Sequence, residues 1–165
     1  YLLGLVGLLA IVAVVVGRQF FRVRRDEALL VELEKSDTAS SRQASDLYEL
    51  GSVQLRKRLY PQAAATLKQA MKRLSGEPDE ARALIENALG FALAAQKDYS
   101  GATKHYELAL KAKADYPVAL NNLAFAQEKL QKDAEAISLY EQTLSLEPEN
   151  ATAKKGLKKL RRRNG

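Results

Sequence analysis

The sequence predicts an all-α protein in which an N-terminal transmembrane helix precedes a solenoid of three helical repeats and a C-terminal capping helix. Three observations support this fold class. Residues 1–17 carry no charge, whereas the rest of the chain is rich in good helix formers such as Ala, Leu, Lys, Glu and Gln. Val and Ile are concentrated at the start of the chain, which disfavours strands in the remainder. The same residue types also return at a period close to 34 residues.

The apolar run at residues 1–17 is expected to cross a membrane. At about 1.5 Å per residue it would span roughly 25 Å, slightly less than a hydrocarbon core of about 30 Å, and Phe20 and Phe21 would extend it into the interface. A cleaved signal peptide is the main alternative, but the run leads into arginines and not into a small-residue cleavage site. A buried core helix is the second alternative, and this run lacks the polar face that such a helix needs.

Four arginines follow the apolar run: Arg18, Arg22, Arg24 and Arg25. Lys and Arg favour the membrane side that is not translocated, so we expect the repeats to face cytoplasm, stroma or an equivalent compartment. Contact with anionic lipid headgroups is a second role open to them. The anchor and its flank are assigned to residues 1–25. Residues 26–43 are expected to extend the helix and then to form a polar linker at residues 36–41.

Three segments in the following part of the chain repeat one another. Gly51, Gly90 and Ala124 occupy the same place in each; the last two are 34 residues apart and the first two 39 apart. The polar stretch 75–80 accommodates the excess. The aligned residues are Leu47, Leu50, Tyr60, Ala63, Leu67 and Ala70 in the first segment, Leu89, Tyr99, Ala102, Tyr106, Ala109 and Leu110 in the second, and Leu120, Leu123, Ala136, Tyr140, Thr143, Leu144 and Pro148 in the third.

This spacing has a physical reason. Each segment would form two antiparallel helices, with small side chains where they cross and bulky ones between neighbouring units, so that stacking supplies the core. Pro61 and Pro117 fall where helices would begin, and proline is tolerated there because that N–H has no intrahelical partner. The stretch 144–151, LSLEPENA, has the composition of a helix end that runs into the next helix.

These residues resemble the tetratricopeptide repeat (TPR) family over about residues 44–150. The resemblance implies units at residues 44–82, 83–116 and 117–150, within a domain that spans residues 44–165. Two positions depart from the family's pattern. Leu47, Glu86 and Leu120 stand where a bulky aromatic residue is usual, and Asp133 stands where the other units have Tyr60 and Tyr99. The angles between units are therefore left open.

Residues 151–163 are expected to form a capping helix. Ala153, Leu157 and Leu160 lie on one helical face and would cover the last repeat. The rest of the helix is basic: Lys154, Lys155, Lys158, Lys159, Arg161, Arg162 and Arg163. Without these seven residues the net charge of +6 becomes −1, so the basicity belongs to the ends and the middle disfavours nucleic acid. The basic face has three interpretations: a solubilising outer surface, a contact with anionic lipid, or a contact with an acidic partner or RNA.

The TPR resemblance implies that the first helix of each unit lines a concave protein-binding face. Asn side chains there would bond a partner backbone, and Phe91 and Phe125 would be apolar anchors. The alternative is that these are ordinary solvated or half-buried helix positions. The candidate groove residues are Tyr48, Ser52, Leu55, Arg56, Asn87, Phe91, Ala94, Asn121, Phe125, Glu128 and Lys129.

Chaperone-binding members of the family clamp a C-terminal carboxylate with Lys, Arg and Asn side chains. This chain has Tyr48, Ser52, Ala88, Val118 and Asn122 at the matching places, so the clamp is absent. A receptor for chaperone tails by that mechanism is therefore disfavoured.

No enzyme is expected. The chain has no cysteine, its glycines are scattered and form no phosphate loop, and its acidic residues are placed as on solvated helix faces. The single histidine, His105, is expected to be exposed on a second helix and to act neither as a base nor as a ligand. We therefore expect no catalytic residue, no metal and no cofactor.

The order of anchor, basic flank, linker, three units and basic end resembles that of small thylakoid-anchored TPR proteins that assist photosystem I assembly in cyanobacteria and plastids. The resemblance implies a scaffold with photosystem I subunits or other assembly factors as partners, and a bilayer contact through residues 1–17. Two alternatives stay open: a bacterial inner-membrane TPR adaptor for complex assembly or quality control, and an organellar protein-import receptor.

Overall fold

The computed structural model describes residues 14, 15, 18, 19, 22, 24–31, 43–76 and 78–164. The chain divides into two units, Tyr1–Ser41 and Arg42–Gly165. Among the described residues α-helix is the only regular secondary structure, and turns and irregular segments join the helices, which confirms the predicted all-α class for them. The second unit holds the repeats and is the one that positions the candidate site.

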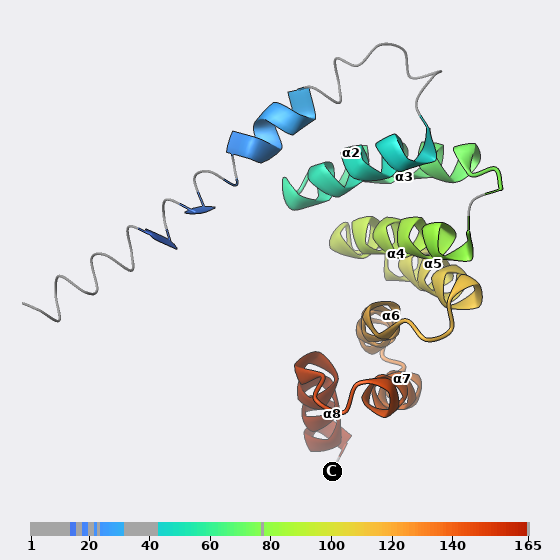
Figure 1. Cartoon of the computed structure of the whole chain (residues 1–165). Helices are drawn as coiled ribbons and strands as arrows, with labels where there is room; N and C mark the ends of the chain where they lie inside the picture. The colour runs from blue at the N-terminus through green and yellow to red at the C-terminus, as the bar shows by residue number, and fades with distance from the viewer. Residues whose placement is uncertain are drawn as a thin grey trace, which may run out of the picture. The chain divides into compact units, whose positions relative to one another are not determined.

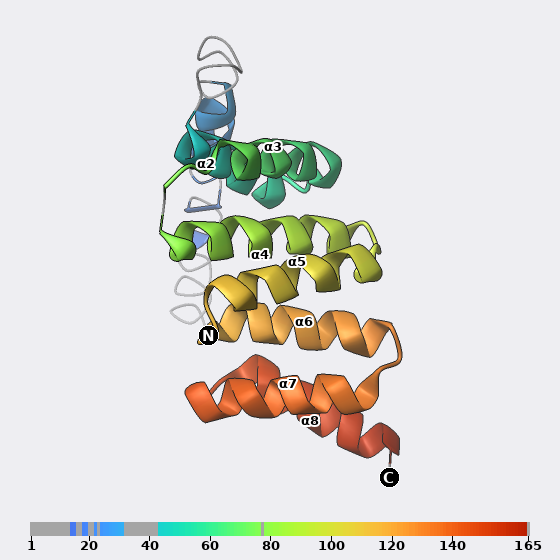
Figure 2. The same ribbon diagram turned by 90° about the vertical axis from the view of Figure 1, so that its right-hand side faces the viewer.

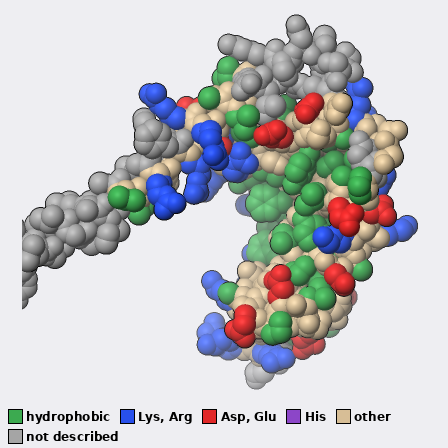
Figure 3. Space-filling view, in the orientation of Figure 1, with side chains coloured by type: hydrophobic (Ala, Val, Ile, Leu, Met, Phe, Trp, Pro, Cys, Tyr) green, Lys and Arg blue, Asp and Glu red, His purple; other side chains and the backbone are tan. Residues whose placement is uncertain are grey.

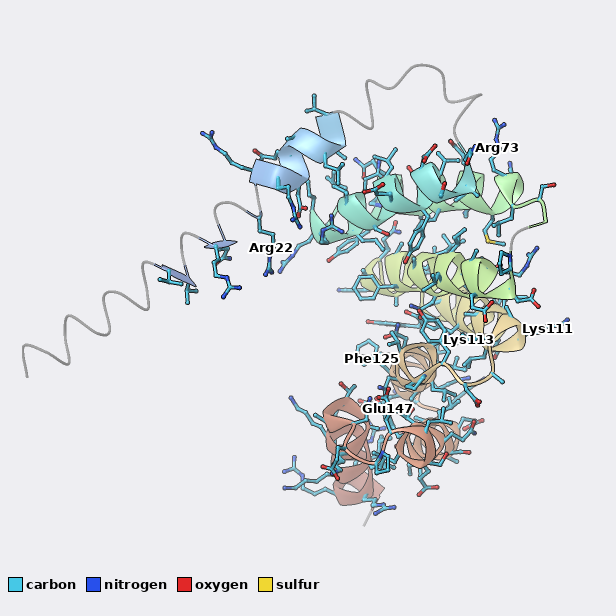
Figure 4. All side chains as sticks on the ribbon, viewed as in Figure 1. Arg22, Arg73, Lys111, Lys113, Phe125 and Glu147 are labelled. Atoms are coloured by element: carbon cyan, nitrogen blue, oxygen red, sulfur yellow. The ribbon has the colours of Figure 1, made fainter. Side chains whose placement is uncertain are left out.

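In the first unit, residues 24–31 form the longest continuous described helical stretch. Most of the run 1–17, for which the sequence predicts a transmembrane helix, lies outside the described residues, as does the predicted linker at 36–41. Among the residues that are described, no helix combines the length and the apolarity needed to cross a membrane. The arginines of the flank, among them Arg22 (Figure 4), are exposed.

The second unit is a stack of helix pairs (Figures 1 and 2). Its helices are α2 (Ala44–Arg56), α3 (Tyr60–Arg73), α4 (Asp79–Ala95), α5 (Tyr99–Ala112), α6 (Pro117–Lys129), α7 (Asp133–Leu146) and α8 (Ala151–Asn164). Helices α2–α3, α4–α5 and α6–α7 form the pairs, each pair packs on the next, and α8 packs on α7 and α6. The stack curves, and the first helix of each pair and α8 lie toward its concave side (Figure 1).

Short turns join the two helices of each pair. Arg58, Lys97 and Gln131 occupy the same place in the three turns, and their φ angles are 60°, 67° and 61°. This left-handed conformation costs a residue other than glycine about 1 kcal/mol or more. The three turns therefore repeat one backbone shape that the side chains themselves do not favour.

The helix starts agree with the predicted proline positions and differ at one boundary. Pro61 and Pro117 lie in the first turns of α3 and α6, as predicted. Helix α4 begins at Asp79, one turn before the start of the second unit that the sequence suggested at residue 83. Asp79 and Glu80 suit this early start, because carboxylates stabilise the positive end of a helix dipole.

The core follows the repeated small residues. All nine predicted positions are buried: Gly51, Ala63 and Ala70, then Gly90, Ala102 and Ala109, then Ala124, Ala136 and Thr143. At Gly90 the backbone approaches the ring of Tyr106 so closely that a Cβ atom would lie 2.6 Å from Cε1. Gly51 meets the side chain of Leu67 in the same way, at 2.8 Å. The small residues therefore set how closely the two helices of a pair pack, as the spacing predicted.

Helix α8 closes the stack through an apolar face. Ala153, Leu157 and Leu160 are buried against α7 and the end of α6, as predicted for a capping helix. Burying a leucine side chain fully contributes roughly 2 kcal/mol. Gly156 allows the close approach, because a Cβ atom there would lie 2.4 Å from the ring of Tyr140.

Candidate protein-binding groove

The first helix of each pair carries its predicted partner-binding residues at spacings of three and four, which places them on one face. Phe91 of α4 and Phe125 of α6 are the large apolar side chains among them, 44% and 43% exposed. Figure 4 shows Phe125 projecting from α6. Of the remaining candidates, Tyr48, Ser52, Leu55, Asn87, Ala94 and Asn121 are half-buried, Arg56 and Lys129 are exposed, and Glu128 is buried.

Each exposed phenylalanine is supported by a tyrosine from the preceding pair. The Phe91 ring meets Tyr60 edge to face, with centroids 6.5 Å apart, and the Phe125 ring meets Tyr99 at 6.3 Å. Such contacts contribute about 0.5–1.5 kcal/mol beyond burial. The two rings are therefore held at fixed places while half of their surface stays open to solvent.

A hollow of about 310 Å³ lies between these two phenylalanines. It is lined by Phe91, Ala94, Ala95, Lys97, Tyr99, Tyr106, Asn122 and Phe125. The charged residues at its edge are basic: Lys97 lines it, and Lys129 Nζ lies 5.2 Å from the Phe125 ring centroid, within the range of a cation–π contact. The hollow therefore combines apolar walls with a positive edge.

Two further apolar residues belong to this face and were missed by the sequence analysis. Leu84 and Val118 are 42% and 54% exposed and precede Phe91 and Phe125 by seven residues each. Seven residues are two helical turns, so each pair shares one face. Leu84 also lines a second hollow, of about 320 Å³, together with Tyr48. The spacing of seven was visible in the sequence and could have identified both residues.

The asparagines of the groove bond to neighbouring units. Asn87 Nδ2 donates to the Tyr116 hydroxyl at 3.4 Å, and Asn121 Nδ2 donates to Asn150 Oδ1 at 3.0 Å. Asn122 Nδ2 donates to Asn87 Oδ1 at 2.9 Å. Burial raises the pKa of Tyr116, a nearby Tyr48 adds to the rise, and the bond from Asn87 opposes it. The amide groups predicted to be available to a partner therefore already connect one unit to the next.

Other predicted groove residues are also engaged within the chain. Glu128 is only 6% exposed, and its carboxylate accepts a hydrogen bond from Lys159 of α8. The Ser52 hydroxyl donates to the Tyr48 carbonyl oxygen at 2.8 Å. Phe91, Phe125, Leu84 and Val118 therefore form the main open apolar surface of the groove, beside the exposed Arg56 and Lys129.

The prediction that His105 is exposed is wrong. It is half-buried, and its Nδ1 lies 2.7 Å from Oε2 of Glu86, which is buried in α4. The same contact explains how an acidic residue occupies a place where the family usually has an aromatic one. A buried carboxylate needs a hydrogen-bonding partner, and His105 supplies it from the second helix of the pair. The pair therefore joins α4 to α5.

The basic residues of α8 divide into paired and unpaired ones. Lys159 pairs with Glu128, Arg163 with Asp133, Lys154 with Glu149 at 2.7 Å, and Arg161 with Glu141 at 3.2 Å. The Asp133 contact raises the pKa of Arg163. Lys155, Lys158 and Arg162 are exposed and form no ion pair with any residue that the structure describes. Four of the seven charges therefore bind α8 to the stack or to its own connecting turn.

The sequence of this chain is similar to one protein family and to several known proteins. Residues 117–150 match the tetratricopeptide repeat family. The chain is 33% identical, over 93% of its length, to the tetratricopeptide repeat domain-containing protein PYG7, chloroplastic, of Arabidopsis thaliana. It is 29% identical, also over 93% of its length, to the uncharacterized protein ycf37 of Guillardia theta. The matches cover 51% and 86% of those two proteins, so the chain spans about half the length of the Arabidopsis relative.

Solved structures agree with the fold. The first TPR domain of Spaghetti (RPAP3), solved with an HSP90 peptide, superposes with a TM-score of 0.69 at 25% identity, covering 74% of this chain and 93% of that one. MamA superposes with a TM-score of 0.75 at 20% identity, covering 82% and 77%, which supports the fold alone. The repeated helix pairs, the family match and these likenesses lead to one conclusion: the chain belongs to the tetratricopeptide repeat family.

Proposed function

We propose that the chain is a membrane-tethered scaffold that holds a segment of another protein in its groove during assembly of a membrane protein complex. Photosystem I is the complex to which the architecture points, and its subunits or other assembly factors would be the partners. The membrane would be the thylakoid membrane, with the repeats on its stromal or cytoplasmic side. The observation that carries the proposal is the pair of exposed rings, Phe91 and Phe125, fixed on the concave side.

Those rings suit the central contacts of a protein interface. Aromatic residues that are positioned in advance lose little conformational freedom on binding and are enriched among the residues that dominate affinity. Burying the open half of one ring would contribute about 1 kcal/mol or more. Leu84 and Val118 extend the apolar surface along the same helices, so that a partner segment would contact two consecutive units.

The comparisons support this proposal in two ways. The name of the Arabidopsis relative describes it as chloroplastic, which favours a plastid setting for this chain as well. The RPAP3 domain was solved with a bound peptide, which favours peptide binding by a stack of this shape. The carboxylate clamp is absent here, so we expect recognition through apolar anchors and not through a chaperone tail.

The proposed tether rests on the sequence of residues 1–17 and on the arginines that follow. Attachment to a membrane confines the groove near nascent or unassembled membrane proteins. Confinement raises the effective concentration of a weak binding site to about the millimolar range when the linker is short. A groove with few anchors can therefore still capture its partner.

Co-purification after gentle detergent extraction tests the proposal. The affinity-tagged chain and its Phe91→Ala/Phe125→Ala variant would be purified from thylakoid-containing cells, and the bound proteins identified by mass spectrometry. We expect photosystem I subunits or assembly factors with the unchanged chain and severalfold less of them with the variant. Leu108→Ala is the matched control, because Leu108 is 44% exposed but belongs to α5, a second helix.

Circular dichroism must show that the double variant keeps its helices, because both rings also contact tyrosines. Recovery of only envelope or translocase proteins would contradict the photosystem proposal and favour an import receptor. Equal recovery by the unchanged chain and the folded double variant would contradict the groove as the binding surface.

A further inference from the structure

Resting on the proposed function, which places a protein segment in the groove, we propose that the groove continues onto α8 and becomes a carboxylate-binding site there. The segment it selects would carry apolar side chains for Phe91 and Phe125 and acidic side chains for Lys155 and Arg162. The capping helix would then decide which partner is bound, in addition to closing the stack.

Helix α8 occupies the place that the first helix of a fourth unit would take. Ala153, Leu157 and Leu160 are buried at positions that follow buried Ala119, Leu123 and Ala126 of α6 by one repeat length. The hydrogen bonds agree with this register. Asn121 of α6 donates to Asn150, just before α8, as Asn87 of α4 donates to Tyr116, just before α6. Helix α8 also contacts both α6 and α7, as α6 contacts both α4 and α5.

This register assigns the basic residues of α8 to groove positions. Lys155 occupies the place in α8 that Asn87 has in α4 and Asn121 in α6. Lys159 occupies the place that Phe91 and Phe125 have in those helices. Arg162 follows Glu128 in the same way. The groove is therefore apolar along α4 and α6 and basic along α8. Figure 3 shows the same change, with hydrophobic side chains gathered at the level of α4 to α6 and Lys and Arg side chains over α8.

Only part of this positive charge is neutralised within the chain. Glu128 pairs with Lys159 and Asp133 with Arg163. Lys155 and Arg162 lie on the same face, are exposed, and have no ion-pair partner among the described residues. Seven residues separate them, about 10 Å along the helix axis, so they would meet two different carboxylates.

The other cations of α8 provide an internal control. Lys154, Lys158 and Arg161 lie on the opposite flank of the buried face and follow Leu120, Ala124 and Gln127 of α6 by one repeat length. In α6 this flank includes Ala124, which packs with Ala136 and Tyr140 of α7. None of the three lies at a groove position, and Lys154 and Arg161 pair on this side with Glu149 and Glu141. Neutralising two of these three cations lowers the net charge of α8 by the same amount as neutralising Lys155 and Arg162, but it leaves the groove positions unchanged.

The concave position favours a protein segment over a membrane surface as the occupant. A planar layer of headgroups reaches convex or flat surfaces, whereas an extended chain can follow the inside of a curved stack. Exposed cations beside apolar walls attract carboxylates and fix the direction in which such a segment lies. Anionic lipid and RNA are the competing ligands that the experiment must separate from it.

Fluorescence anisotropy with the full chain in mild detergent tests the inference. The labelled probes are synthetic peptides with a leucine- and phenylalanine-bearing segment followed or preceded by glutamates, and the same peptides with glutamine in place of glutamate. For the better glutamate peptide we expect Lys155→Gln/Arg162→Gln to weaken binding roughly three- to tenfold at low salt. The glutamine peptide should bind equally to both proteins. Lys154→Gln/Lys158→Gln should change the Kd for either peptide less than twofold.

Several results would overturn the inference. These are equal binding of glutamate and glutamine peptides, equal effects of the two double variants, or no binding of any peptide. Vesicles of phosphatidylglycerol or single-stranded RNA could displace the glutamate peptide from the unchanged chain. If they do so, and do not do so with Lys155→Gln/Arg162→Gln, the inference is also overturned. The proposed function is judged separately, because Phe91→Ala/Phe125→Ala should weaken the glutamate and glutamine peptides alike and reduce co-purification. If the groove binds a protein segment but α8 does not select carboxylates, these two effects of Phe91→Ala/Phe125→Ala will still be observed.

Discussion

Gly90→Ala should destabilise the stack, although alanine is the better helix former. Within a helix, alanine is favoured over glycine by about 1 kcal/mol. The added Cβ, however, would lie 2.6 Å and 2.7 Å from Cε1 and Cδ1 of Tyr106, whereas carbon atoms pack at about 3.5–4.0 Å. Tyr106 is 1% exposed and packs with Ala102, Leu123 and Ala126, so its ring can move only by disturbing these contacts. Overpacking of this kind costs about 1–3 kcal/mol, and we expect a net loss of about 1 kcal/mol.

Urea denaturation followed by circular dichroism, on the chain in mild detergent, measures this loss. A double-mutant cycle with Tyr106→Leu isolates the contact. Once the ring is absent, Gly90→Ala should stabilise the chain by about 1 kcal/mol, so the sign of its effect reverses. At the equivalent position of the next unit the chain carries Ala124, and Ala124→Gly should lower stability there. An increase in stability on Gly90→Ala with Tyr106 present would refute the argument from close packing.

Two further predictions concern the turns and the buried phenols. Lys97→Gly should stabilise the chain by about 0.5–1 kcal/mol because glycine adopts the positive φ without strain; Lys97→Ala, which keeps the strain and loses the side chain, should give no gain in urea denaturation. Burial and Glu128 raise the pKa of Tyr140 to about 12 from 10. Its phenolate is therefore favoured in the unfolded chain, and the stability that Tyr140 contributes below pH 10 should be lost as the pH rises to about 12. Tyr140→Phe should make the denaturation midpoint less dependent on pH in that window, and an unchanged pH dependence would contradict the assignment.

The helices of the stack could be predicted from the sequence because the residue patterns that indicate them are local. The repeat of Gly51, Gly90 and Ala124, and the prolines at 61 and 117, identify the helix pairs without any knowledge of long-range contacts. The apolar face of residues 151–163 likewise predicts a helix packed on the last unit. The sequence pattern does not specify the start of α4 at Asp79, which lies in the polar stretch 75–80 that accommodates the extra residues of the first segment.

The properties of the groove were less accessible because they depend on how neighbouring units meet. The sequence shows Asn87 and Asn121 on one face but not that their amides reach Tyr116 and Asn150 in the following unit. The charged neighbours of His105 along the helix predict that it is exposed, whereas its burial depends on Glu86 across the helix pair. Contacts of this kind need the angle between helices, which the sequence pattern alone does not provide.

One flank of α8 has no further helix packed on it among the described residues, and this bears on self-association. In α6 the corresponding flank is covered by α7, and a stack of similar units could in principle grow into an open filament, with one molecule adding to the end of another. Lys154, Lys158 and Arg161 occupy this flank; Lys154 and Arg161 pair with Glu149 and Glu141, whereas Lys158 has no ion-pair partner among the described residues. Lys158 follows Ala124, a small residue at a close helix crossing, by one repeat length. Packing a further helix on this flank would bury its ammonium group unless that helix supplied a carboxylate, and this cost disfavours growth of the stack into a filament.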